Sequence, residues 1–214
     1  MRFTETLAAG VRDLWQEAAE KSFVRGMAEG NLEEERFRRY MIQDYLYLQD
    51  YTNLLKYMKE YASDSRLASF FTEAEEATRI ETETVHIPGM KRIGITDEDI
   101  QTAIKDPVIE EYAGYMRSQA EEDYLAGLVA LLQCSWVYAY IGQTMTARYA
   151  KELARSPFKS WFEAYAAEEY SEANRMWIDT VDRETSGITQ EEAAKLCRIF
   201  VRCAEYENSF WDVL

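Results

Sequence analysis

Apolar residues recur along most of this chain at spacings of three and four rather than at every second position. That period places them on one side of an α-helix. Between Thr4 and Glu20, for example, Leu7, Val11 and Leu14 fall on one stripe. Because only 3 prolines and 9 glycines interrupt the pattern, it predicts helix almost throughout and an all-α fold.

Polar residues mark several helix ends. Asn31, followed by Glu33–Glu35, predicts an N-cap with acids in the first turn, where the helix dipole favours them. Thr96–Asp99 and Thr189–Glu192 have the form of capping boxes, in which a threonine and an acid satisfy each other's backbone N–H groups.

Long helices are predicted at about Ser65–Val85, stopping before Pro88, and at about Glu121–Arg155. No repeat, low-complexity tract or linker divides the chain. Residues 1–214 are therefore predicted to form a single-domain helical bundle.

The charge balance excludes some partners. Lys and Arg number 24 against 39 Asp and Glu, a net charge of −15, which opposes binding to nucleic acids and to anionic membranes. No apolar run approaches the roughly 18–20 residues that a membrane span needs. The N-terminal segment lacks the apolar core of a signal peptide, and the 3 cysteines form no C-x-x-C pair, so we expect reduced thiols and a cytoplasmic location.

The most apolar stretch, LLQCSWVYAYIG at Leu131–Gly142, contains a cysteine. Cys134 and Tyr138 lie one helical turn apart and so share a helix face. A thiol beside a phenol in an apolar helix is either a reaction centre or ordinary core. Inert buried cysteines are the commoner case, and no nearby histidine completes a Cys-His pair. The residues alone leave both interpretations open.

Asp44 interrupts an aromatic helix face formed by Tyr40, Tyr47 and Tyr51. A buried carboxylate needs a hydrogen bond or a charged partner. Asp44 is therefore either a structural residue bonded to a tyrosine hydroxyl or a ligand-orienting group suited to an amino group or a ring nitrogen.

A second candidate acid lies near the C-terminus. Phe210 and Trp211 follow Glu207 at helical spacing, and desolvation by these rings is expected to raise the pKa of Glu207 toward the general acid/base range. Glu205 competes for the buried position, and spacing alone does not choose. Tyr112 and Tyr165 are among 15 tyrosines; several of them converging with a thiol and an acid would bind a flat ring.

The sequence predicts no metal and no cofactor. Glu83-x-x-His86 has the form of one half of a di-iron site, but that site needs two such motifs and His86 is the only histidine. The cysteines lack metal-site spacing, and no glycine-rich phosphate loop is present.

Together these stretches resemble the TenA (thiaminase II) family. Leu131–Tyr138 is similar to its LLPCxWxY motif, and the likeness continues in family order over about residues 40–211. The other matching segments are Gln43–Leu48, Tyr112–Tyr115, Trp161–Tyr165 and Tyr206–Trp211.

The resemblance implies a haem-oxygenase-like helical bundle, assembled as a homotetramer, that uses no metal or haem. It implies hydrolysis of thiamin-derived aminopyrimidines, and often of thiamin itself, to hydroxymethylpyrimidine in thiamin salvage. Cys134 is then the nucleophile, Glu207 the acid/base in preference to Glu205, and Asp44 the group that holds the pyrimidine. The residues implied to surround the ring are Tyr47, Tyr112, Tyr138, Tyr165 and Phe210.

Two departures from the family pattern stand out. Gln133 replaces the proline usual before the cysteine, and Asn208 and Ser209 make the last motif more polar. They motivate one alternative, a hydrolase of a different ring amine. Another is a non-catalytic ligand-binding or regulatory protein on the same fold, although the acidic charge opposes direct contact with DNA.

Overall fold

A computed structural model describes residues 2–214, and among these residues there is no β-strand. The all-α prediction is confirmed. The helices form two compact units. We call residues up to Glu33 together with Leu125–Val213 the terminal unit, and Glu34–Tyr124 together with Leu214 the central unit.

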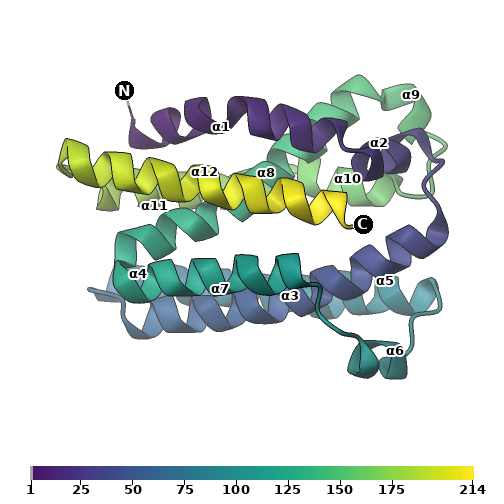
Figure 1. The fold of residues 1–214 in the computed structure, drawn as a ribbon, viewed down its shortest axis with the longest axis horizontal. Helices are drawn as coiled ribbons and strands as arrows, with labels where there is room; N and C mark the ends of the chain where they lie inside the picture. Colours follow the sequence, from purple (N-terminus) through teal and green to yellow (C-terminus); the bar gives the residue numbers. More distant parts are fainter. Residues whose placement is uncertain (1) are drawn as a thin grey trace. The chain divides into compact units, whose positions relative to one another are not determined.

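The terminal unit is built around the two ends of the chain. Its helices are α1 (Phe3–Glu20), α2 (Ser22–Glu29), α8 (Tyr124–Arg148, from Leu125 on), α9 (Ala150–Leu153), α10 (Lys159–Ala166), α11 (Glu168–Glu184) and α12 (Gln190–Asp212). Helix α1 lies along α12 and also contacts α11, while α2 contacts α10 and α12 (Figure 1). The predicted stripe on α1 is buried at Leu7 and Val11.

The central unit is organised on one long helix. Its elements are α3 (Glu34–Glu60), α4 (Ser65–Glu81), a π-helical turn η1 (Thr82–His86), α5 (Ile87–Arg92), α6 (Asp97–Thr102) and α7 (Pro107–Glu122). Helix α3 packs against both α4 and α7, and η1 contacts α3, α4 and α5 (Figure 1).

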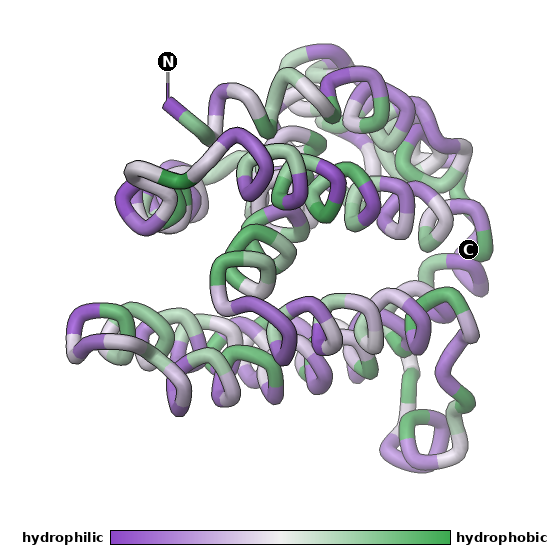
Figure 2. Tube along the Cα trace, turned by 60° about the vertical axis from the view of Figure 1, so that its left-hand side comes forward, coloured by the Kyte–Doolittle hydropathy of each residue, from purple (hydrophilic) through white to green (hydrophobic). Residues whose placement is uncertain are grey.

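The helices of each unit carry both hydrophilic and hydrophobic positions (Figure 2). Helix α8 stands apart: by length and composition it could cross a membrane, which differs from the expectation that no run approaches that length. However, 72% of its most apolar window is buried inside the protein. Burial in the core accounts for this composition, as it does for other helices that are apolar all round.

Two of the predicted helix starts are confirmed. The Thr96 side chain accepts a bond from the Asp99 backbone N–H, and the Asp99 carboxylate accepts one from the Thr96 N–H, which opens α6. Thr189 and Glu192 make the same reciprocal pair at the start of α12.

The predicted N-cap at Asn31 is wrong. Helix α3 begins later, at Glu34. Gly30 has a φ of 75° and ends α2, and the Asn31 N–H donates to the carbonyl of Gly26. Asn31 therefore belongs to the C-terminal turn of α2, where a glycine in the left-handed region reverses the chain.

The predicted stop before Pro88 is also wrong. The chain stays helical through the π turn and into α5, where Pro88 lies in the first turn. A proline is tolerated there because the missing N–H has no intrahelical partner in a first turn. The single helix predicted at Glu121–Arg155 is likewise divided, since α7 ends at Glu122 and α8 at Arg148.

Candidate active site

In the central unit, one face of α3 is buried as the aromatic row predicted. Tyr40, Asp44, Tyr47 and Tyr51 are all at most 7% exposed. The Tyr47 ring stacks on Tyr112 of α7, with ring centroids 5.5 Å apart and planes 18° apart. The Tyr47 hydroxyl also lies 3.9 Å from the sulfur of Met116. The structure therefore brings three predicted residues, Asp44, Tyr47 and Tyr112, into one unit.

The partner of Asp44 was missed by sequence reasoning. His86 Nε2 lies 2.8 Å from Asp44 Oδ2, and both residues are buried, at 4% and 3% exposed. Burial alone would lower the pKa of His86, but the hydrogen bond to Asp44 and the negative charges of Asp44 and Glu81 raise it above its ordinary value. The only signal in the sequence was that His86 is the sole histidine, and its Glu-x-x-His context pointed to a metal ligand rather than to a partner of Asp44.

Next to Asp44, Gln43 anchors the segment between α6 and α7. Its side-chain amide donates to the Ile104 carbonyl at 2.9 Å and accepts from the Asp106 N–H at 2.8 Å. The turn of α3 that carries Asp44 is thereby tied to the start of α7, the helix that carries Tyr112.

In the terminal unit, aromatic rings gather from three helices. Tyr138 of α8 lies 4.9 Å from Tyr165 of α10 and 5.6 Å from Trp211 of α12, measured between ring centroids. Phe210 is adjacent to Trp211 at 5.4 Å and is 6% exposed. The predicted residues Tyr138, Tyr165 and Phe210 thus belong to one continuous aromatic cluster.

A glycine permits this arrangement. A Cβ atom at Gly142 would lie 2.7 Å from the backbone carbonyl carbon of Tyr165 and 2.8 Å from the Ala166 nitrogen. Only glycine lets the backbones of α8 and α10 approach so closely. Gly142, the last residue of the Leu131–Gly142 stretch, therefore sets the place of Tyr165.

Cys134 is half-buried on α8, one turn before Tyr138. The neighbouring Ser135 is held from α11: its hydroxyl lies 3.1 Å from the Asn174 amide oxygen, and its carbonyl accepts from the Tyr170 hydroxyl at 3.3 Å. Asn174 in turn donates to the Tyr170 carbonyl. This network fixes the turn of α8 that carries the thiol, and sequence reasoning did not find it.

The other cysteines differ from Cys134. Cys203 is completely buried, and this burial raises the pKa of its thiol well above the ordinary value, with a further increase from the Glu207 carboxylate. Burial also raises the pKa of Cys197. A thiol held protonated is a poor nucleophile, which leaves Cys203 as a core residue.

Burial distinguishes the two acids near the C-terminus, Glu205 and Glu207. Glu207 is 2% exposed, whereas Glu205 is exposed and pairs with Arg202 at 2.9 Å. Glu207 is therefore the acid within the core of the terminal unit.

Both departures from the family pattern are accommodated. Gln133 is buried within the uninterrupted helix α8, so its replacement of a proline leaves no break. Asn208 is buried and donates to the Leu14 carbonyl at 3.1 Å, which ties α12 to α1. Ser209 bonds to the carbonyl of Glu205, a residue of its own helix.

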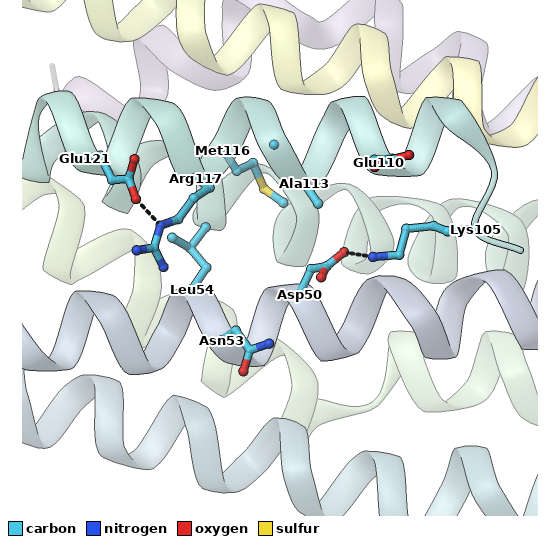
Figure 3. A pocket seen from close by; sticks show the side chains of 10 residues that line it. Asp50, Asn53, Leu54, Lys105, Glu110, Ala113, Met116, Arg117 and Glu121 are labelled. Atoms are coloured by element: carbon cyan, nitrogen blue, oxygen red, sulfur yellow. Dashed lines mark hydrogen bonds and ion pairs between the residues drawn. The ribbon is translucent and has the colours of Figure 1, made fainter. Parts of the chain in front are cut away.

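A cavity of about 420 Å³ lies between α3 and α7 in the central unit (Figure 3). Four of its five charged residues form two ion pairs, Lys105 with Asp50 and Arg117 with Glu121, and the fifth is Glu110. None of the predicted site residues lines it. Among residues 2–214, no three His, Cys, Asp or Glu side chains gather as metal ligands.

The chain is similar to known proteins over its whole length. A model of the TENA/THI-4/PQQC family matches residues 8–214. The aminopyrimidine aminohydrolase of Halalkalibacterium halodurans is 31% identical over 215 residues, covering 100% of this chain and 95% of that protein. The aminopyrimidine aminohydrolase of Helicobacter pylori is 26% identical, covering 100% of this chain and 98% of that protein.

Solved structures share the fold. A TenA homologue from P. horikoshii OT3 superposes with a TM-score of 0.84 at 25% identity, covering 100% of this chain and 98% of the other. A TenA homologue from Pyrococcus furiosus gives a TM-score of 0.89 at 21% identity, covering 99% and 98%.

Proposed function

Because the chain belongs to the TENA/THI-4/PQQC family, we propose that it is an aminopyrimidine aminohydrolase of thiamin salvage. The family resemblance that the sequence motifs predicted is confirmed by the match over residues 8–214. The proposal is supported by the candidate site together with the similarity to a relative of known name. A half-buried thiol, Cys134, and a buried acid, Glu207, accompany an aromatic cluster in a chain 31% identical to an aminopyrimidine aminohydrolase.

In this proposal the substrate is a thiamin-derived pyrimidine bearing an aminomethyl group, and water replaces its amine. The Cys134 thiolate forms a bond to a ring carbon, which breaks the aromaticity of the ring and lets the amine leave. Glu207 donates a proton to the departing amine and then accepts one from the attacking water. Loss of the thiolate restores the ring, so the products are hydroxymethylpyrimidine and ammonia.

Asp44 has the recognition role. A carboxylate accepts hydrogen bonds from an exocyclic amino group and from a protonated ring nitrogen, the two polar groups that an aminopyrimidine presents. The aromatic side chains suit the ring itself, since flat rings stack at little desolvation cost. These residues are Tyr47, Tyr112, Tyr138, Tyr165 and Phe210.

The proposal includes a cytoplasmic homotetramer that needs no metal or cofactor. Support comes from the family resemblance for the tetramer and from the odd cysteine number for a reducing compartment. Size-exclusion chromatography with light scattering tests whether the protein is a tetramer. Activity that persists after dialysis against a chelator would agree with a reaction that needs no metal.

Product analysis tests the activity. Purified protein is incubated with 4-amino-5-aminomethyl-2-methylpyrimidine and, in parallel, with thiamin, and hydroxymethylpyrimidine is quantified by chromatography. We expect product from the aminopyrimidine at a rate that scales with enzyme concentration. Binding of hydroxymethylpyrimidine without turnover of either substrate would instead identify a ligand-binding protein, and turnover of another ring amine alone would redefine the substrate.

A further inference from the structure

His86 occupies an unusual place in the helical framework. It is the last residue of the π-helical turn η1, between α4 and α5. Successive residues of an α-helix are rotated by roughly 100° about the helix axis. The wider π turn changes this rotation, and so it changes the direction of the side chains that follow it. π-helical turns of this kind are uncommon and recur at functional sites.

The π turn brings the imidazole to a carboxylate on another helix. His86 Nε2 lies 2.8 Å from Asp44 Oδ2, although the residues are 42 positions apart. Both groups are almost fully buried, so bulk solvent does not supply their hydrogen bonds. Removing one member of such a pair leaves a buried polar group without compensation, so the two side chains hold each other in place.

We infer that His86 is a positioning residue that fixes the Asp44 carboxylate for recognition of the aminopyrimidine ring. The inference rests on the proposed function for the identity of the ligand. A carboxylate that is held through one oxygen keeps a defined plane, which sets the direction from which the amino group and ring nitrogen of the substrate meet it. Binding groups act best when a second layer of hydrogen bonds locks them.

The charges around His86 come from two of the elements packed against it. Asp44 is on α3 and Glu81 is the last residue of α4, and both favour the protonated imidazole. The charged residues of α5, Lys91 and Arg92, are exposed, as is Glu83 in the π turn itself. Both acids therefore raise the pKa of His86 and favour a cationic neighbour for the Asp44 carboxylate.

The first test uses the fact that His86 is the only histidine of the chain. Its imidazole gives one set of NMR signals, which can be titrated without assignment. We expect the pKa of His86 to lie above the ordinary histidine value of about 6.5 in the wild type and to be lower in Asp44→Asn. Hydroxymethylpyrimidine should shift these signals in the wild type.

Two substitutions separate positioning from mere structure. His86→Gln keeps a side-chain N–H donor, whereas His86→Leu removes it. We expect KM to rise roughly 10-fold or more in His86→Leu and only a few-fold in His86→Gln, because a hydrogen bond to a charged group is lost in the first and kept in the second. The value of kcat should change less than about threefold in both variants, since the reacting thiol belongs to another helix, α8.

The outcomes are distinct. Wild-type KM in a folded His86→Leu variant overturns the inference, and so does a histidine signal that hydroxymethylpyrimidine leaves unchanged while it binds. If His86→Leu does not fold, the comparison of His86→Gln with the wild type decides, since positioning requires its KM to stay within a few-fold. If the wild type turns over no aminopyrimidine, the proposed function fails, while the dissociation constant of hydroxymethylpyrimidine in the same variants still tests the positioning of Asp44.

Discussion

The two units of the molecule carry different chemistry. In the central unit, the predicted residues are a carboxylate paired with an imidazole and two stacked tyrosines, none of which is a strong nucleophile. In the terminal unit they are a thiol, a buried acid and an aromatic cluster. In the proposed reaction, the carboxylate that recognises the ring, Asp44, and the reacting groups, Cys134 and Glu207, therefore belong to separate sets of helices. Substitution of Asp44 should therefore act mainly on substrate binding, and substitution of Cys134 or Glu207 on the chemical step.

The largest effect is expected at Cys134. Cys134→Ala should lower kcat by about 10³-fold or more while the fold survives, because the bond-forming atom is removed from a half-buried position. Steady-state kinetics with the aminopyrimidine and a circular dichroism melt measure both. Cys197→Ala is the matched control, since Cys197 is also half-buried and should keep kcat within about twofold. Equal kcat in both variants would refute a nucleophilic role for Cys134.

The next largest effect is expected at the buried acid. Glu207→Gln keeps the shape of the side chain but cannot transfer the proton, so kcat should fall by about 10²–10³-fold with little change in KM. Glu205→Gln, two residues away and exposed, should behave like the wild type. If Glu205→Gln is the slower enzyme, the assignment of the acid is reversed.

Asp44→Asn sharpens the contrast between the units. The amide removes the charge that attracts the ring's polar groups, so KM should rise by about 10–100-fold. In contrast to the Cys134 and Glu207 variants, kcat should fall by less than the increase in KM. Initial rates over a wide substrate range distinguish the two parameters, and a variant that loses kcat alone would remove the division of roles between the units.

Gly142→Ala tests the packing of the terminal unit. The added methyl group would meet the backbone at Tyr165, so we expect a loss of about 1–3 kcal/mol in unfolding free energy and a lower kcat. Gly10→Ala is the control, because a Cβ there meets nothing within 4 Å and a helical alanine should stabilise by about 0.5–1 kcal/mol. Urea unfolding measures the change in unfolding free energy for each variant, and the two changes should have opposite signs.

The smallest effect concerns pH in the central unit. The pKa of His86 is raised in the folded protein, so its pairing stabilises the fold fully below the unfolded value near 6.5 and loses this contribution as the pH rises through the raised pKa. The difference in unfolding free energy between the wild type and His86→Gln should therefore decrease from pH ~6 to pH ~9. A difference that stays constant or grows over that range would contradict the pairing.

Much of the fold is readable from the sequence because its signals are local. The spacing of apolar residues predicted an all-α chain, and the capping boxes at Thr96 and Thr189 are present. The buried face of α3 followed from the aromatic row around Asp44. Each of these features depends on residues within a few positions of one another.

The contacts that complete the candidate site are not local, and the sequence did not reveal them. The Asp44–His86 pair joins residues 42 positions apart, and it depends on a π turn that no residue pattern marked. The close approach of Gly142 to Tyr165 depends likewise on how two helices pack. The residues alone made Cys134 and Glu207 candidates but left their roles open, and only the family resemblance chose between a reacting thiol and ordinary core, and between Glu207 and Glu205.

Selective alkylation is the sharpest test of whether the thiol of Cys134 performs the reaction. The wild-type protein is treated with limiting iodoacetamide, with and without hydroxymethylpyrimidine, and each sample is divided between an activity assay and peptide mass spectrometry of the 3 cysteines. We predict that activity falls in proportion to modification of Cys134 and that the pyrimidine slows this modification. Full activity in protein whose Cys134 is completely alkylated would exclude this thiol as the nucleophile.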